Sequence, residues 1–125
     1  MALKSNVHIL FVDDDELLTE TTSEMLTTRG CVITNESHGW TALQYFSEHP
    51  DDFDLAIIDP TMIGITGLEL AQRFRRIQRD FPVILYGGNI DSSLLHDAEE
   101  AGVSCCQKPA TNEELVQVIR QALKR

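Results

Sequence analysis

The stretch VHILFVDDDE, residues 7–16, decides the fold. Its first six residues form a nearly continuous apolar run rich in β-branched side chains, and four acidic residues follow without a gap. A continuous apolar run, unlike an alternating one, is typical of a strand buried on both faces, as in a parallel sheet. Four acidic side chains in a row repel one another and oppose folding unless a positive charge lies among them. The stretch therefore predicts a buried strand that ends beside a positively charged partner.

The rest of the chain repeats the alternation of strand and helix. Four more apolar runs follow: CVIT at 31–34, LAII at 55–58, VILY at 83–86 and VSCC at 103–106. The segments between and after them have apolar residues at helical spacing. These predicted helices span residues 18–26, 42–46, 68–77, 91–100 and 115–123. The first, second and fourth are followed by residues that end helices: Gly30, Pro50 and Gly102. The third and fifth begin with the capping-box patterns TGLE and TNEE.

Five strand–helix units in 125 residues predict one α/β domain over residues 1–125. Right-handed crossovers then give an open, doubly wound five-stranded parallel sheet with helices on both faces, in the flavodoxin-like strand order 2-1-3-4-5. Residues 1–5 are expected either to remain from an expression vector or to be disordered. In such a fold, sites form outside the carboxyl ends of the strands.

Composition narrows the function classes. The chain is 42% apolar, so we expect a globular protein. No apolar run approaches the roughly 20 residues of a membrane span, and the N-terminus lacks a secretory signal, so we expect no membrane contact. The net charge of −10 argues against nucleic-acid binding by this domain. The arginines of RFRRIQR, residues 73–79, have helical spacing and are expected to form a solvated helix face.

The cysteines are informative about the compartment. There are three, an odd number, and Cys105 and Cys106 are adjacent. Neighbouring residues point to opposite faces of a strand, so these two could not easily form a disulfide. We therefore expect all three, with Cys31, to be reduced core thiols in a cytoplasmic protein.

Chemically active residues follow the predicted strands. Asp13 and Asp14 end the first strand, Asp59 ends the third, and Lys108 lies just past the fifth. If the first and third strands are neighbours, three carboxylates meet at one edge, and Mg²⁺ prefers such oxygen ligands. An ammonium group beside them can pair with a carboxylate or a phosphoryl oxygen. The set suits phosphoryl transfer to a carboxylate, with Asp59 as nucleophile.

Helix capping is the simpler explanation of an acidic run after a strand. We expect Asp15 and Glu16 to do only that. For Asp13 and Asp14, the additional Asp59 and Lys108 at the ends of two other strands favour the metal site.

These motifs, in this order, resemble those of response-regulator receiver domains of two-component signalling. The similarity covers nearly the whole chain: ILFVDDDE resembles the acidic motif of strand 1, DLAIIDPTMIGITGLEL the phosphoacceptor motif, PVILYGG the strand-4 segment and AGVSCCQKPA the lysine–proline segment. The residues within these motifs look most like those of receivers attached to hybrid sensor histidine kinases.

The resemblance implies a role for each matching residue. Asp59 would be the phosphoacceptor, and Lys108 would contact the phosphoryl group. Asp14 would contact Mg²⁺, with Asp13 binding it directly or through water, and the backbone carbonyl of Thr61 would be a further ligand. The donor would be a histidine kinase or a histidine phosphotransfer domain. Such a domain is not an enzyme beyond self-catalysed phosphotransfer and autodephosphorylation.

Three positions depart from the family pattern. Gly87 stands where the family has Ser or Thr after strand 4, Cys105 where it has an aromatic ring, and Ile63 where it has a Pro. We therefore expect phosphorylation to be retained while the usual switch is lost or altered. Because glycines leave a loop conformationally free, a backbone amide at Gly87 or Gly88 could hold the phosphoryl group in place of the hydroxyl.

Three other functions share parts of this pattern. A degenerate receiver that docks a partner without phosphorylation is favoured by the missing hydroxyl and ring, and opposed by the intact acidic set. A flavodoxin-type carrier would need a Ser/Thr/Gly-rich phosphate loop where this chain has DDDE. An aspartyl-nucleophile phosphatase would need an acid/base Asp two residues after Asp59, where this chain has Thr61.

Overall fold

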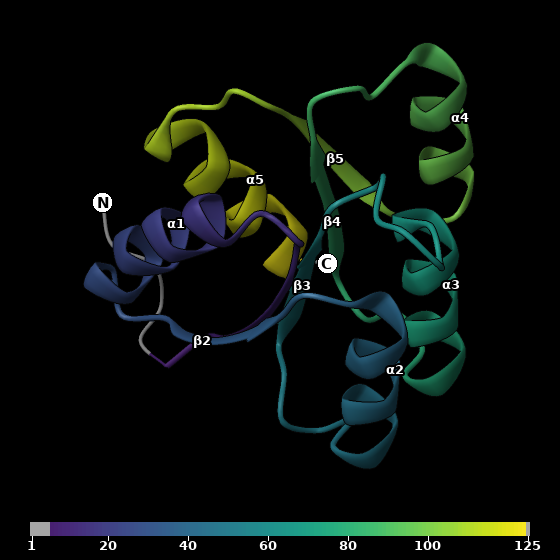
Figure 1. The fold of residues 1–125 in the computed structure, drawn as a ribbon, viewed down its shortest axis with the longest axis horizontal. Helices are drawn as coiled ribbons and strands as arrows, with labels where there is room; N and C mark the ends of the chain where they lie inside the picture. The colour runs from purple at the N-terminus through teal and green to yellow at the C-terminus, as the bar shows by residue number, and fades with distance from the viewer. Residues whose placement is uncertain (1–5, 125) are drawn as a thin grey trace.

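The fold is a five-stranded parallel sheet between two layers of helices (Figure 1). The computed structural model describes residues 6–124, so the expectations for residues 1–5 lie outside it. The strands are β1 His8–Val12, β2 Val32–Glu36, β3 Leu55–Ile58, β4 Val83–Gly87 and β5 Ser104–Gln107. The helices are α1 Glu16–Thr28, α2 Gly39–Glu48, α3 Gly67–Ile77, α4 Ser92–Glu100 and α5 Asn112–Leu123.

The strand order is β2-β1-β3-β4-β5, which confirms the predicted topology. The register matters most between β1 and β3, where Val12 pairs with Ile58. Asp13 and Asp59 each follow one of these partners, so the register alone places them side by side at the carboxyl edge. The backbone continues this pairing, because the Asp59 amide donates to the Val12 carbonyl at 2.9 Å.

The core has two layers because successive strand residues point to opposite faces. Side chains such as Leu10, Ile58 and Leu85 face α2, α3 and α4. Their neighbours along the strands, such as Phe11 and Ile57, face α1 and α5. Figure 1 shows the same division, with α1 and α5 on one side of the sheet and α2, α3 and α4 on the other. Both faces are covered, as predicted.

Burial on both faces was predicted for all five strands, and it is complete only for β3 and β4. β1 is buried except at His8. β2 and β5 form the edges of the sheet, and their side chains are partly exposed; Val32 is 43% exposed. The expectation for the cysteines changes accordingly: Cys31 and Cys106 are buried, but Cys105 on the edge strand is only half-buried. Cys105 and Cys106 do face opposite layers, and all three thiols are free.

Helix ends follow the predicted signals with one exception. Gly30 and Gly102 lie just beyond α1 and α4 with φ of +96° and +74°, a conformation that favours glycine. Both elements of the capping box are present at Thr111. At Thr66 only one is, because the Thr66 side chain accepts from the Glu69 amide while the Glu69 carboxylate lies 3.4 Å from Arg73.

Candidate functional site

Three carboxylates meet at the carboxyl edge of the sheet. Asp13, Asp14 and Asp59 each offer an oxygen, and these oxygens lie within 4.8 Å of one another. Asp13 is buried, Asp59 is half-buried and Asp14 is exposed, so the cluster opens to solvent on one side. The neighbouring Asp15 does not join the cluster; it caps α1, accepting from the Leu18 amide at 3.1 Å. A set of hard oxygen donors with three formal negative charges fits Mg²⁺.

Lys108 reaches this cluster from the loop after β5. Its Nζ lies 3.0 Å from Asp13 Oδ2 and 5.2 Å from the centre of the Tyr86 ring on β4. The other Asp13 oxygen accepts from the Asp15 amide at 2.9 Å. Burial raises the pKa of Asp13, while these two hydrogen bonds oppose the rise and the charge of Asp59 adds to it. The ammonium group thus offsets part of the negative charge of the cluster.

Asp59 is held by the residue two positions later. Asp59 Oδ1 accepts from both the amide and the hydroxyl of Thr61, each at 3.0 Å. The expected role of the Thr61 carbonyl as a metal ligand stays a prediction. The hydrogen bond from the Thr61 hydroxyl to Asp59 was not predicted, because the resemblance implies a role only for the backbone carbonyl of Thr61. The only sequence signal was a hydroxyl residue two positions after a strand-end aspartate, where Thr and Asp commonly form turns.

Pro60 is packed between two glycines. A Cβ built on Gly87 would lie 2.6 Å from Cδ and Cγ of the Pro60 ring, and one on Gly67 would lie 2.6 Å from Pro60 Cα and from the Asp59 carbonyl oxygen. Both distances are shorter than real Cβ contacts. A side chain at position 87 would therefore collide with the Pro60 ring, which occupies its space.

The loop after β4 is more constrained than its glycines suggested. The Gln107 Nε2 donates to the Gly88 carbonyl at 2.6 Å and to the Lys108 carbonyl at 3.0 Å. The Lys108 amide donates to the Gly87 carbonyl at 2.8 Å. Whether the Gly87 or Gly88 amide binds a phosphoryl group stays a prediction. Gln107 is one of the residues at the end of β5, but the link that its side-chain amide makes between the β4 and β5 loops was not predicted.

The loop after Asp59 also contacts α2. A Cβ at Gly64 would lie 3.4 Å from Nε1 of Trp40, and the Arg73 guanidinium carbon lies 5.2 Å from the centre of the indole. Trp40, the second residue of α2, is 51% exposed. Ile63, which replaces the family's proline, is 91% exposed.

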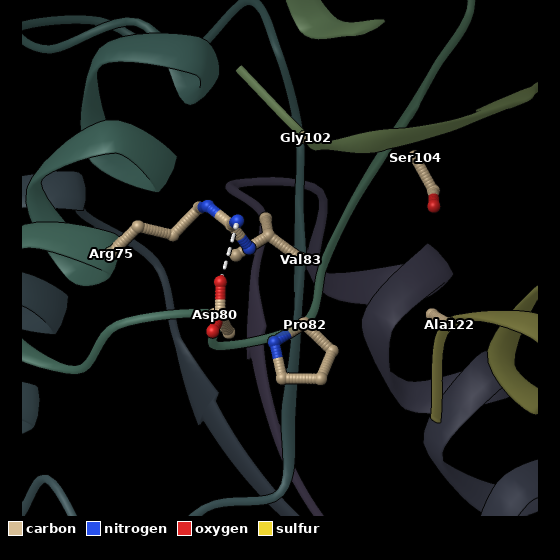
Figure 2. Close-up of a pocket in the computed structure, with 7 residues that line it drawn as sticks. All are labelled: Arg75, Asp80, Pro82, Val83, Gly102, Ser104 and Ala122. Carbon is tan, nitrogen blue, oxygen red and sulfur yellow. Dashed lines mark ion pairs between the residues drawn. The ribbon is translucent and has the colours of Figure 1, made fainter. Parts of the chain in front are cut away.

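A hollow of about 250 Å³ lies at the opposite edge of the sheet from the acidic cluster (Figure 2). Its cation is already engaged: Arg75 Nη1 donates to the Phe81 carbonyl at 2.7 Å, and Nη2 lies 3.8 Å from Asp80 Oδ1. The hollow therefore offers no free charge for a ligand. Within residues 6–124, no helix is long and apolar enough to cross a bilayer.

Comparisons with known proteins give the family. The model of the response regulator receiver domain matches residues 9–120. The transcriptional regulatory protein CseB of Streptomyces coelicolor is 32% identical over 124 residues, which are 98% of this chain and 52% of CseB. A receiver domain structure from Clostridium thermocellum has a TM-score of 0.89 at 24% identity, covering 95% of each chain. The CheX–CheY–BeF₃–Mg²⁺ complex of Borrelia burgdorferi has a TM-score of 0.87 at 19% identity, covering 94% of this chain and 89% of that one.

The chain belongs to the response regulator receiver family. It is a receiver domain of the two-component response regulators, as the motifs predicted. Receiver domains are signalling modules rather than classical enzymes; they generally bind Mg²⁺ in an acidic pocket and interact with histidine kinases or phosphotransfer proteins. The chain spans about half the length of CseB, a transcriptional regulator. The expected attachment to a hybrid histidine kinase stays a prediction.

Proposed function

We propose that this domain accepts a phosphoryl group on Asp59, with Mg²⁺ held by Asp13, Asp14, Asp59 and the carbonyl of Thr61. The observation that carries the proposal is the convergence of three carboxylates to within 4.8 Å, with Lys108 3.0 Å from Asp13. Neither capping nor packing explains why a lysine just past the last strand pairs with an acid just past the first, beside a further acid just past the third.

The proposed transfer uses few groups. An Asp59 carboxylate oxygen attacks phosphorus, the P–N bond to the donor's imidazole breaks, and the imidazole leaves with the bonding electron pair. Lys108 is placed to pair with a phosphoryl oxygen and to offset its charge. Bound Mg²⁺ would supply further charge neutralisation at this edge. Hydrolysis reverses the modification: water attacks phosphorus, and the carboxylate and inorganic phosphate are released.

The switch that follows phosphorylation is proposed to be atypical. Gly87 carries no hydroxyl, and Cys105 is a small, half-buried thiol on an edge strand. Neither residue can perform the paired movement of a hydroxyl and a ring that the resemblance implies for the family. We expect the β4–β5 face to respond weakly to phosphorylation.

The second candidate is a docking module that binds its partner without phosphorylation. The Pro60 ring against Gly87 favours it, because that contact excludes a switch side chain. Under both candidates the partner is a histidine kinase or a phosphotransfer domain, residues 1–125 form one receiver domain, and the domain is cytoplasmic. Under both, the domain itself binds no nucleic acid and has no further enzyme activity.

The test is phosphorylation by a small donor. We expect acetyl phosphate with Mg²⁺ to add one phosphoryl mass to the intact protein, and Asp59→Asn to add none. Asp54→Asn is the matched control, since Asp54 precedes β3 at the opposite edge and accepts only from the His8 amide among the described side-chain bonds. A wild type that stays unmodified and does not bind beryllofluoride with Mg²⁺ would leave the docking module as the function.

A further inference from the structure

We propose that Thr61 supplies the hydroxyl that this site lacks on β4. Its Oγ1–H donates to the Asp59 carboxylate before phosphoryl transfer and turns to a phosphoryl oxygen afterwards. This inference rests on the proposed function and assigns a catalytic contact to a residue for which the resemblance implies only a backbone role.

The first argument is steric. A side chain on Gly87 would enter the space of Cδ and Cγ of the buried Pro60 ring, at 2.6 Å. A hydroxyl residue at position 87 is therefore incompatible with Pro60 in its present place. The absence of a hydroxyl at position 87 and the presence of a proline at position 60 are therefore linked, because the proline ring fills the space that the hydroxyl residue would need.

The second argument is geometric. The Asp59 oxygen nearest to a Cβ at position 87 is Oδ1, at 3.7 Å. The same oxygen accepts the Thr61 hydroxyl at 3.0 Å. The hydroxyl thus reaches the part of the carboxylate that a side chain on β4 would have faced, but it approaches from the loop after β3.

The third argument is chemical. Thr61 is an exposed residue, and its hydroxyl carries one donor that rotates to the better acceptor. Once phosphorus is bonded to the carboxylate, the non-bridging phosphoryl oxygens carry more negative charge than Asp59 Oδ1. Hydrogen bonds to charged acceptors are the stronger ones, so the donor shifts to the phosphoryl group. The Thr61 amide remains on Oδ1 and keeps the loop in place.

The test compares variants that differ in this one hydroxyl. With acetyl phosphate and Mg²⁺, we expect Thr61→Val to lower the phosphorylation rate of Asp59 by roughly 10-fold to 100-fold, the usual effect of losing one hydrogen bond to a charged group. Thr61→Ser, which keeps the hydroxyl, should stay close to wild type. Thr28→Val is the matched control, because the Thr28 hydroxyl binds a helix carbonyl in α1.

A rescue experiment tests the relocation itself. Gly87→Thr should not restore the rate of Thr61→Val, because Pro60 blocks the new side chain. The triple variant with Pro60→Ala, Gly87→Thr and Thr61→Val removes the blocking atoms and should recover at least 10-fold of the rate. Beryllofluoride affinity should follow the same order, and thermal melting shows that each variant is folded.

Equal rates for wild type and Thr61→Val would overturn the inference and leave the proposed function intact. So would a Thr61→Ser variant as slow as Thr61→Val, because packing rather than the hydroxyl would then be responsible. A folded wild type that accepts no phosphoryl group would overturn both.

Discussion

Asp13 is an almost fully buried acidic residue, with 3% of its surface exposed. Burial raises the pKa of Asp13 above its usual 3.8, although the Asp15 amide and Lys108 oppose the rise. A carboxyl group whose pKa is raised by folding stabilises the fold below its unfolded pKa, and that contribution is lost as pH rises through the folded pKa. Once ionised, Asp13 therefore lowers the stability of the metal-free protein.

We expect Asp13→Asn to raise the free energy of unfolding of the metal-free protein at pH 7 by roughly 1 kcal/mol, because a buried charge and its repulsion with Asp59 are removed. The variant should also lose most of the stabilisation that Mg²⁺ gives the wild type, since a neutral amide is a weaker ligand for a hard cation. Urea denaturation with and without Mg²⁺ measures both effects. Lower stability of the variant without metal would contradict the argument from burial.

At this scale the carboxylates and Lys108 could be predicted from the sequence, and the contacts that position them could not. Asp13, Asp59 and Lys108 each follow a strand, and parallel strands end at one edge. The packing of Pro60 on Gly87 depends on how closely β3 and β4 approach, and the sequence shows only a glycine and a proline. The Gln107 bonds depend on loop conformation in the same way.

Among the elements, α3 begins against the site itself. Its first residue, Gly67, donates its amide to the Pro60 carbonyl at 3.1 Å, and Thr66 caps the helix. A methyl group on Gly67 would lie 2.6 Å from backbone atoms of Asp59 and Pro60, which cannot rotate away.

We expect Gly67→Ala to destabilise the protein by about 1–3 kcal/mol, the usual cost of overpacking, although alanine favours helices elsewhere. Because the displaced backbone carries Asp59, phosphorylation by acetyl phosphate should slow as well. Urea denaturation and intact mass measure the two effects. Gly88→Ala, where a Cβ would meet nothing within 4 Å, is the control for a glycine without close neighbours. A Gly67→Ala variant more stable than the wild type would show that the backbone of Asp59 and Pro60 shifts at little energetic cost.

The start of α5 gives a pH-dependent test. Glu114 accepts from the Thr111 amide at 2.8 Å, and this bond lowers the pKa of Glu114 below its usual 4.5. A carboxylate with a lowered pKa stabilises the fold above its unfolded pKa, and the contribution is lost as pH falls through the folded pKa.

We expect Glu114→Gln to be slightly less stable than the wild type at pH 7, with the difference shrinking as pH falls below 4.5. Thermal melting over a pH series measures the difference. Glu113→Gln is the control, because Glu113 lies in the same turn and its pair with Arg29 is on the surface. A difference that persists at low pH would mean that the charge of Glu114 does not contribute.

Element positions were predictable where local signals and tertiary structure agree. Apolar runs marked the strands, and Gly30 and Gly102 marked helix ends. The signals failed to predict the partial exposure of β2, because an apolar run does not reveal whether its strand lies at the centre or the edge of a sheet. They failed at Thr66 because Glu69 has a competing partner in Arg73, one turn further along α3.

Across the whole molecule, stability depends on an aromatic cluster between the sheet and α2 and α3. Phe46 is fully buried; its ring centre lies 4.3 Å from that of Phe74 and 4.7 Å from that of Phe81. This cluster belongs to the core layer that faces α2, α3 and α4. The other core layer, between the sheet and α1 and α5, shares no side chains with it.

We expect Phe46→Ala to cost about 3–5 kcal/mol, a large part of the 5–15 kcal/mol of a typical domain. Both layers pack on one sheet, so they should unfold together in a single transition at a lower temperature. Differential scanning calorimetry measures this, with Phe46→Leu as the milder variant. Two separate transitions would show that the layers are independently stable.

The position of Trp40 has a practical consequence. It is the only tryptophan of the chain, and its indole rests on Gly64 in the loop that carries Asp59. Any change that shifts this loop alters the surroundings of a single fluorophore, so emission intensity can report on events at the acidic edge without a label. The chain thereby carries its own optical probe for following occupancy of the site in real time.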